Sequence, residues 1–359
     1  MKKIRIWIAL ILSLTLTLQV SSVSAANKTS ESYLAYDIVN HHAYNELDDF
    51  MAADIIDGTL NEHGLVEIKP NHSVTRAQFT KILVNALNLK ASASSKTFID
   101  VKKDDWHYEY ITIASSLGIV TGREDGKFYP YEQIKREHMA AMIHRAFKNS
   151  VAFKRTNTSF KDVPATHWAY KEINEASSVG IINGYTETNE FRPLNKATRA
   201  QAVLMIHRAL KQETKNTPTA QSIEKFMRGH VDAEMSLLRA NDFSALETLF
   251  NKNTTGFYRT VGLESIDMYK LFADMGATLS IEPVGTYTIS ITHLNDRYVQ
   301  VETKNAKQKV HIKQGTSTYK DTLDVSGVYS LRKDLSGNWK IYNYIPTDES
   351  LANRSLFGL

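Results

Sequence analysis

The chain has 359 residues, of which 42% are hydrophobic, and this length allows two or three domains, each with its own core. It contains no cysteine, which excludes disulfide bonds, thiol catalysis and thiolate zinc sites. The 43 basic and 39 acidic residues give a net charge of only +4. This balance argues against a nucleic-acid partner, which needs a concentrated basic face.

The first 25 residues have the pattern of a secretory signal peptide. Three basic residues precede an apolar stretch at residues 6–20, and small residues end the segment at Ala25. We expect cleavage after Ala25 or Ala26, which leaves 40 basic against 39 acidic residues. The alternative is a retained membrane anchor, but the apolar stretch falls short of the ~20 residues that a span needs. The sequence therefore predicts a secreted protein without a transmembrane anchor.

A block of about fifty residues occurs twice in nearly the same layout, at residues 98–148 and 160–211, and once in degenerate form at residues 34–90. Phe-x-Asp is followed by Trp six residues after the Asp, and by Gly sixteen residues after the Trp. Phe-x-Pro comes next, with an Arg six residues after the Pro. These residues are Asp100, Trp106, Gly122, Pro130 and Arg136 in the second block, and Asp162, Trp168, Gly184, Pro193 and Arg199 in the third.

The first block keeps only part of this layout. It has Gly58, and it has Arg76 six residues after a proline. Counting back sixteen residues from Gly58 gives His42 in place of the Trp, and the same count puts Tyr36 in place of the Asp. The second block has Lys135 where the other two have threonine before the Arg. We therefore expect one of the blocks to have a weakened or lost form of whatever function the shared layout serves.

Each block predicts two helices. In the first helix, apolar residues recur at i, i+3 and i+6, and Gly118 and Gly180 follow where helices commonly end in a left-handed residue. The second helix begins at the repeated Arg, with Thr75 and Thr198 as N-caps. A helical hairpin of this size cannot bury its apolar face alone, so the blocks should pack on one another.

Residues 212–219 are polar and contain a proline, which is typical of a linker, and residues 220–359 predict a separate domain. Ser222 and Asp242 are candidate caps of two helices, and a third is expected near residues 266–275. The apolar period then changes to two, which favours strands near residues 287–291, 298–301, 310–312, 323–325 and 339–341. Helices followed by a meander of strands indicate an α+β domain, with the helices on one face of an antiparallel sheet.

The repeated residues, namely Phe-x-Asp-Val with Trp, Gly-Ile-Ile-Asn-Gly-Tyr, Phe-Arg-Pro and Thr-Arg-Ala-Gln, resemble the S-layer homology domain of bacterial surface proteins. The resemblance covers about half of the chain. It implies a mostly α, pseudo-threefold bundle with one repeat per prong. It also implies grooves that bind secondary cell wall polysaccharide, often carrying a pyruvate ketal, and so hold the protein on the wall.

The chemistry of the repeated residues fits a carboxylate-bearing sugar. Arg136, Arg199 and less surely Arg76 would offer a planar donor fork at a positive helix start. An exposed position at the helix start is the reason to prefer this binding role over a structural one. Trp106 and Trp168 are candidate sugar platforms, and Gly122 and Gly184 would let backbone amides approach the ligand.

Structural alternatives stand beside these roles. The two tryptophans could instead belong to the core. Asp100 and Asp162 are expected to cap a turn or pair with an arginine. His144 and His207 should be structural, because a cation suits the C-terminal end of a helix.

The C-terminal domain resembles, by order of elements only, the nuclear-transport-factor-like cone folds, and such a fold does not determine function. Its 16 basic and 16 acidic residues do not indicate strong electrostatic capture. His230, His293 and His311 lack metal-ligand spacing, so neither a metal nor a cofactor is expected.

Two hypotheses remain open. The first is a non-enzymatic surface protein, anchored on the cell wall, that displays a C-terminal binding or assembly domain with an unknown ligand. The alternative is a wall-anchored glycan hydrolase that uses two carboxylates. The candidate carboxylates are Glu234, Glu247, Glu264 and Asp267. The simpler interpretation of each is that it lies on a solvated face of a helix.

Overall fold

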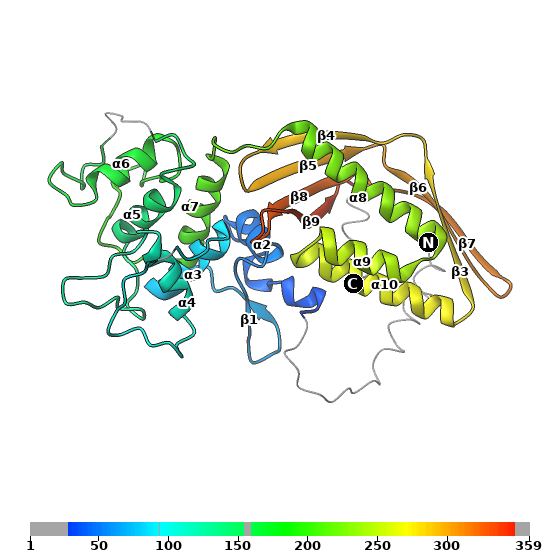
Figure 1. Cartoon of the computed structure of the whole chain (residues 1–359), viewed down its shortest axis with the longest axis horizontal. Coiled ribbons are helices and arrows are strands. Elements are labelled where there is room, and N and C mark those ends of the chain that lie inside the picture. Colours follow the sequence, from blue (N-terminus) through cyan, green and yellow to red (C-terminus); the bar gives the residue numbers. More distant parts are fainter. Residues whose placement is uncertain (1–27, 93, 154–158, 349–359) are drawn as a thin grey trace.

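A computed structural model describes residues 28–92, 94–153 and 159–348 (Figure 1). The expected signal peptide lies outside these residues. A largely helical part at one end of the long axis contains the three blocks, and a strand-rich part at the other end contains the C-terminal domain (Figure 1). This is the multidomain order of helices and strands that the sequence predicts.

The helical part consists of short elements joined by loops. Its elements are η2 (Ser30–Tyr33), η3 (Tyr36–Ile38), α2 (Tyr44–Ala52), β1 (Thr59–Leu60), β2 (Val66–Glu67), α3 (Arg76–Leu87), α4 (Tyr108–Ser116), α5 (Arg136–Phe147), α6 (Tyr170–Ser178) and α7 (Arg199–Lys211). Thr75 and Thr198 cap α3 and α7, each in a capping box with the glutamine three residues on. Lys135 gives α5 no side-chain cap. Gly118 and Gly180 have left-handed backbones after α4 and α6, as predicted.

The three blocks form a closed ring of backbone hydrogen bonds. Val74 donates to the carbonyl of Ala197, Ala197 donates to Ile134, and Ile134 donates to Val74, at 2.9 to 3.0 Å. At the start of each second helix, the first two amides donate to the Pro-containing loop of the next block. For α3 these acceptors are Glu132 and Pro130. The ring has the pseudo-threefold order that the resemblance implies.

A carboxylate holds the proline-containing loop in every block, which is Phe-x-Pro in the second and third blocks and Ile-Lys-Pro in the first. Asp100 accepts from the amides of Phe128 and Tyr129 at 2.8 Å, and Asp162 accepts from the equivalent amides of the third block. In the first block Asp37 does the same for Ile68 and Lys69, at 2.9 and 2.7 Å. The aspartates are structural, as predicted, but each holds a loop 28 to 30 residues further along the chain and not the turn that follows it or an arginine. The assignment of Tyr36 to this position is wrong by one residue, because the loops of the first block differ in length.

This carboxylate stabilises an unfavourable backbone. The middle residues of the three loops, Lys69, Tyr129 and Arg192, have φ of 58°, 61° and 60°. Non-glycine residues pay roughly 1–3 kcal/mol for such a conformation, which persists only where the surroundings determine it. The two amide bonds to each aspartate supply that determination and direct the loops toward the neighbouring block.

The C-terminal domain begins with three helices, α8 (Ala220–Ala240), α9 (Phe243–Asn253) and α10 (Gly256–Asp274). Its strands are β3 (Ala277–Val284), β4 (Thr288–Leu294), β5 (Tyr298–Lys304), β6 (Lys307–Gln314), β7 (Ser317–Asp324), β8 (Gly327–Lys333) and β9 (Trp339–Pro346). Asp242 caps α9 as predicted. Thr219, not Ser222, caps α8. The prediction missed β3 and β8, and it began the third helix ten residues late, since α10 starts at Gly256.

The strands form two antiparallel sheets, with orders β3-β6-β7 and β4-β5-β8-β9, where one sheet was expected. One apolar cluster joins α8 to the four-stranded sheet through Ile223, Met227 and Leu331. Another joins the helices to the three-stranded sheet through Leu246, Phe250 and Ile281. Gly262 is needed there, because an added Cβ would lie 1.9 Å from the Phe250 ring.

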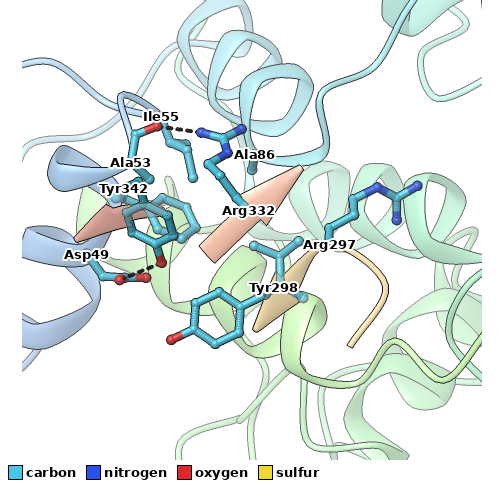
Figure 2. Close-up of a pocket in the computed structure, with 10 residues that line it drawn as sticks. Asp49, Ala53, Ile55, Ala86, Arg297, Tyr298, Arg332 and Tyr342 are labelled. Carbon is cyan, nitrogen blue, oxygen red and sulfur yellow. Dashed lines mark hydrogen bonds between the residues drawn. The ribbon is translucent and has the colours of Figure 1, made fainter. Parts of the chain in front are cut away.

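The C-terminal domain docks directly on the repeats. Tyr298 and Tyr342 belong to the same apolar cluster as the repeat core, and Tyr342 donates to Asp49 of α2 at 2.8 Å (Figure 2). Arg332 of β8 donates to the carbonyls of Ala53 and Asn85, which lie in the first block. These groups border a cavity of about 20 Å³, which has room for about one water molecule. The interface is therefore closely packed.

Candidate functional site

The repeated arginines lie at the junctions between blocks, and they are mostly buried. Arg76 and Arg136 are only 7% and 4% exposed, so the prediction of an exposed helix start is wrong. Arg76 Nε donates to the carbonyl of Phe128 at 2.9 Å, and Arg136 Nε donates to that of Phe191 at 2.8 Å. Each guanidinium also lies 4.7 Å from the ring of the same phenylalanine. The arginines thus have a structural role that joins neighbouring blocks.

The helix starts are not free either. The first two amides of α3, α5 and α7 donate to the next block, and the third amides of α3 and α7 donate to their threonine caps. An anion that approaches these junctions would therefore meet guanidinium groups and not open helix amides. We name the junctions by their blocks: junction 1/2 contains Arg76, junction 2/3 contains Arg136, and junction 3/1 contains Arg199.

Junctions 1/2 and 2/3 each contain a second arginine that the sequence analysis missed. Arg123 lies 4.2 Å from the ring of Tyr129, and Arg192 lies 3.9 Å from the ring of Tyr185. Burial, followed by the nearby Arg123, lowers the pKa of Arg76. These two arginines occupy different positions of the repeat, so the spacing gave no signal. Junctions 1/2 and 2/3 therefore each hold two guanidinium groups that lie against aromatic rings. This arrangement suits an anionic ligand.

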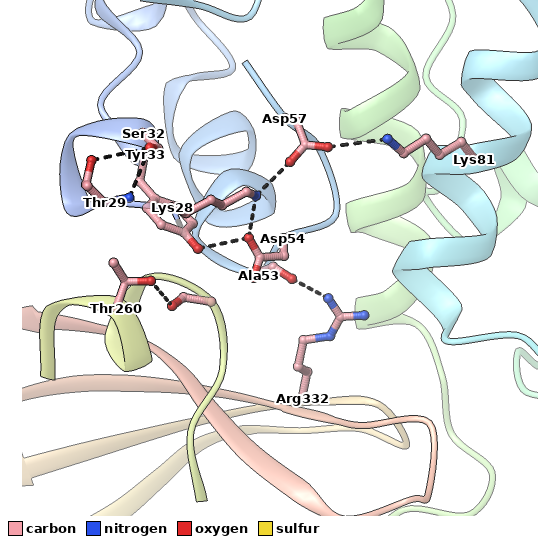
Figure 3. Close-up of polar contacts among 11 residues, drawn as sticks. Lys28, Thr29, Ser32, Tyr33, Ala53, Asp54, Asp57, Lys81, Thr260 and Arg332 are labelled. Atoms are coloured by element: carbon pink, nitrogen blue, oxygen red, sulfur yellow. Dashed lines mark hydrogen bonds and ion pairs between the residues drawn. The ribbon is translucent and has the colours of Figure 1, made fainter. Parts of the chain in front are cut away.

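Junction 3/1 has a different composition. Arg199 donates to the carbonyl of Asp57 at 2.7 Å, and Ile68 stands where the other blocks have the phenylalanine. The carboxylate of Asp57 pairs with Lys28 at 2.7 Å and with Lys81 at 3.3 Å (Figure 3). The cations around this carboxylate are thus already paired within the chain. The other junctions also contain an acid, since Arg123 pairs with Glu132 and Arg192 pairs with Glu190. Junction 3/1 differs in that Asp57 is present without a second arginine.

Trp106 and Trp168 are 49% and 50% exposed, so the alternative that they belong to the core is wrong. Trp168 packs on His138 of α5, with ring centroids 5.3 Å apart. The pKa of His138 is lowered to about 4 by burial and then by the charges of Arg76 and Lys135. The exposed Trp168 ring thus packs on a histidine that is close enough to Arg76 and Lys135 for their charges to lower its pKa. A half-exposed indole beside cations can contact the apolar face of a sugar.

Gly122 and Gly184 have a packing role. A Cβ on Gly122 would lie 2.4 Å from the Phe98 ring and 2.9 Å from the carbonyl of Lys127, and one on Gly184 would lie 2.2 Å from the Phe160 ring. The ring of each Phe-x-Asp motif therefore rests against the glycine of its own block. This explains the fixed spacing without a ligand.

We expect Gly122→Ala to lower the free energy of unfolding by about 3 kcal/mol or more, because the Cβ overlaps the ring and φ is +70°. Gly126→Ala is the matched control, since Gly126 has a φ of +76° but open space around its Cβ. It should cost about 1 kcal/mol. Urea titration of both variants measures the difference. Equal losses would mean that the ring contact contributes nothing.

The helix-end histidines are structural, as expected, but their partners lie in other blocks. His144 Nε2 lies 2.7 Å from Glu175, and His207 Nε2 lies 3.4 Å from Asp49. These pairs join the second block to the third and the third to the first. The two histidines therefore contact residues of neighbouring helices, and they also lie toward the C-terminal ends of their own helices.

All four acidic candidates of the C-terminal domain contact other residues of the chain. Glu247 and Asp267 both pair with Lys270, and Glu264 accepts from the Ser30 amide at 3.0 Å. Glu234 differs, because its side chain is only 24% exposed and lies 3.7 Å from His230. Burial raises the pKa of Glu234 to about 7. The prediction of a solvated face is thus wrong for Glu234.

Within residues 28–92, 94–153 and 159–348, no helix is long and apolar enough to cross a membrane. The same ranges contain no cluster of three or more histidine or acidic side chains that could hold a metal ion.

Comparison with known proteins identifies the repeats. A family model described as the S-layer homology domain matches residues 97–140 and 159–203. The chain is 35% identical over 179 residues to "Exoglucanase XynX" of Acetivibrio thermocellus, which covers 47% of this chain and 16% of that protein. It is 30% identical over 151 residues to the "Cellulosome-anchoring protein" of the same species, covering 40% of this chain and 33% of that protein.

A third relative is an "S-layer protein" of Bacillus thuringiensis subsp. finitimus, 26% identical over 214 residues, covering 57% of this chain and 25% of that protein. The chain thus spans a third or less of the length of these three relatives. The first block lies outside the residues that the family model matches. Residues 97–140 and 159–203 are S-layer homology domains, and the chain is accordingly a secreted protein of the cell wall surface.

Proposed function

We propose that the chain is held non-covalently on the wall by a secondary cell wall polysaccharide that carries carboxylate groups, such as pyruvate ketals. The observation that carries this proposal is the repeated arginine pair, Arg76 with Arg123 and Arg136 with Arg192. The Nε atoms of Arg76 and Arg136 serve the fold. Their terminal nitrogens have no hydrogen bond within the residues that the structure describes, and they remain to bind a ligand.

Two junctions on one rigid ring suit a repetitive polymer. Each site can be weak, because the second contact to the same polymer becomes intramolecular once the first has formed. Avidity of ~10²-fold or more is then available when the spacing fits. The exposed rings of Trp106 and Trp168 would add sugar contacts near these sites. Junction 3/1, with Asp57 beside its single arginine, contributes least to binding in this proposal.

In this proposal the C-terminal domain is displayed from the wall as a binding or assembly module. It is not joined to the repeats by the linker alone, because Tyr342 and Arg332 donate hydrogen bonds to the first block. The first block thereby gains a second task, as the platform that orients the displayed domain. The Lys28 and Asp54 pair lies near Arg332 (Figure 3). Close to this pair, the ring of Tyr33 packs on Phe257 of α10, with centroids 5.5 Å apart.

The proposal is tested by co-sedimentation of the chain with purified cell walls. Binding should be lost when the polysaccharide is extracted from the walls, and it should fall strongly when mild acid removes ketal groups alone. Walls treated with the same buffers at neutral pH are the control. Binding that persists on extracted walls would show that the repeats have another partner.

A further inference from the structure

Four lysines lie together on one face of the three-stranded sheet, at the end of the molecule away from the repeats (Figure 1). Side chains alternate along a strand, so Lys307, Lys309 and Lys313 of β6 point to the same side. The register pairs His311 of β6 with Lys320 of β7, which adds a fourth lysine to that side. We call this surface, with His311 at its centre, the lysine face.

The lysine face is the solvent side of the sheet. On the other side Ile281 is buried in the cluster with the helices, and Leu279 packs against that cluster. The residues of β3 that share the lysine face, Thr278, Ser280 and Glu282, are exposed. A ligand can therefore reach the lysines without any change in the fold.

The four lysines are only partly compensated. None of them forms an ion pair within the residues that the structure describes, and all four are exposed. The face contains two acids, Glu282 opposite Lys309 and Asp324 opposite Lys307, so four cations stand against two anions. Neighbouring positions on the face are separated by about 7 Å along a strand and about 5 Å between strands. The domain has even charge as a whole, and the fold concentrates cations here.

The face is also hollowed. A shallow pocket of about 390 Å³ is bordered by Ser280, Lys309, Val310, His311, Lys320 and Thr322, and by the acids Glu282 and Asp321. His311 Nε2 is enclosed there without a hydrogen-bond partner within the described chain. Hydroxyl, imidazole and ammonium groups together can bind the hydroxyl and carboxylate groups of a sugar.

Protection of a sheet edge does not explain this arrangement. Lysine is common on edge strands because it prevents pairing with another chain. Here three of the four lysines lie on β6, which is the middle strand between β3 and β7. A middle strand has no free edge to protect. Edge protection therefore does not account for the three lysines on β6.

We propose that the lysine face binds an acidic polysaccharide whose negative groups are carboxylates. The choice of this polymer rests on the proposed function, because such a polymer would surround a protein anchored by the repeats. The lysine face and the junctions lie toward opposite ends of the molecule, so one chain could contact the polymer at two places. The C-terminal domain would then be a second glycan contact.

The test measures binding of the full chain to polygalacturonate, a polymer with one carboxylate per sugar, with neutral dextran as the comparison. The triple variant Lys309→Gln, Lys313→Gln and Lys320→Gln should bind polygalacturonate about tenfold more weakly at low salt. Its thermal unfolding should be unchanged, since these side chains make no ion pairs. The matched control replaces Lys215, Lys225 and Lys252, three exposed lysines outside the sheet, by glutamine.

Each outcome decides the inference. Equal weakening by the two triple variants would show a response to net charge alone and would overturn the site. An unchanged affinity in the lysine-face variant would overturn it as well. Failure of the proposed function is distinguishable, because it would appear as wall binding that survives polysaccharide extraction. In that case the lysine-face variant would still bind polygalacturonate more weakly than the native chain if the inference holds.

Discussion

Replacement of Arg76 and Arg136 together by glutamine should weaken binding to polysaccharide-bearing walls by about 100-fold or more. A charge-assisted hydrogen bond contributes roughly 1.5–3 kcal/mol, and the double variant removes one arginine from each of the two binding junctions. Loss of avidity adds to this effect. Co-sedimentation at a series of protein concentrations measures the affinity.

The control for this prediction is Arg199→Gln, at the same position of junction 3/1. Its loss of affinity should be less than about threefold, because Arg199 already donates to Asp57 and lacks a second arginine. Since Arg76 and Arg136 also hold Phe128 and Phe191, unfolding must be measured in parallel.

The variants Arg123→Gln and Arg192→Gln remove the second arginine of the same junctions. These side chains are 42% and 38% exposed, so their loss should weaken binding with little loss of stability. An equal loss of wall affinity in Arg199→Gln and Arg136→Gln would contradict the proposal that junction 3/1 contributes less to binding than junction 2/3.

Arg332→Ala should uncouple the C-terminal domain from the repeats, with a loss of about 3 kcal/mol in interface stability. Two carbonyls of the first block, those of Ala53 and Asn85, would lose their donor within a packed interface. We expect the native chain to unfold in a single thermal transition and the variant to unfold in two. Limited proteolysis should then cut the linker at residues 212–219 faster.

Arg239→Ala is the matched control, because Arg239 is exposed near the end of α8 in the same domain. It should change neither the number of transitions nor the rate of cleavage. Tyr342→Phe, which removes only the hydrogen bond to Asp49, should cost about 1 kcal/mol and keep one transition. A native chain that already unfolds in two steps would show that the interface does not couple the domains.

Local signals explain why much of the helical part could be predicted. The Thr75 and Thr198 caps, the glycines after α4 and α6, and the apolar stripes depend on residues within one turn of each other. The aspartate contacts are not local, because Asp100 accepts from amides 28 and 29 residues further along the chain, and the sequence predicted a contact with the following turn or with an arginine instead. The start of α10 was missed because Gly256 serves a distant contact: an added Cβ would lie 1.9 Å from the carbonyl of Ala52 in α2.

By itself the sequence determined the repeats, their helices, the family of two of them and the order of an α+β domain after a linker. These follow from spacing, capping and periodicity, which are properties of neighbouring residues. The tertiary structure decided that Arg76 and Arg136 join blocks, that Arg123 and Arg192 lie beside them, and that the lysines of β6 remain unpaired on one face. The physical reason is that burial and charge pairing depend on which segments meet in space, and residue counts along the chain carry no record of that.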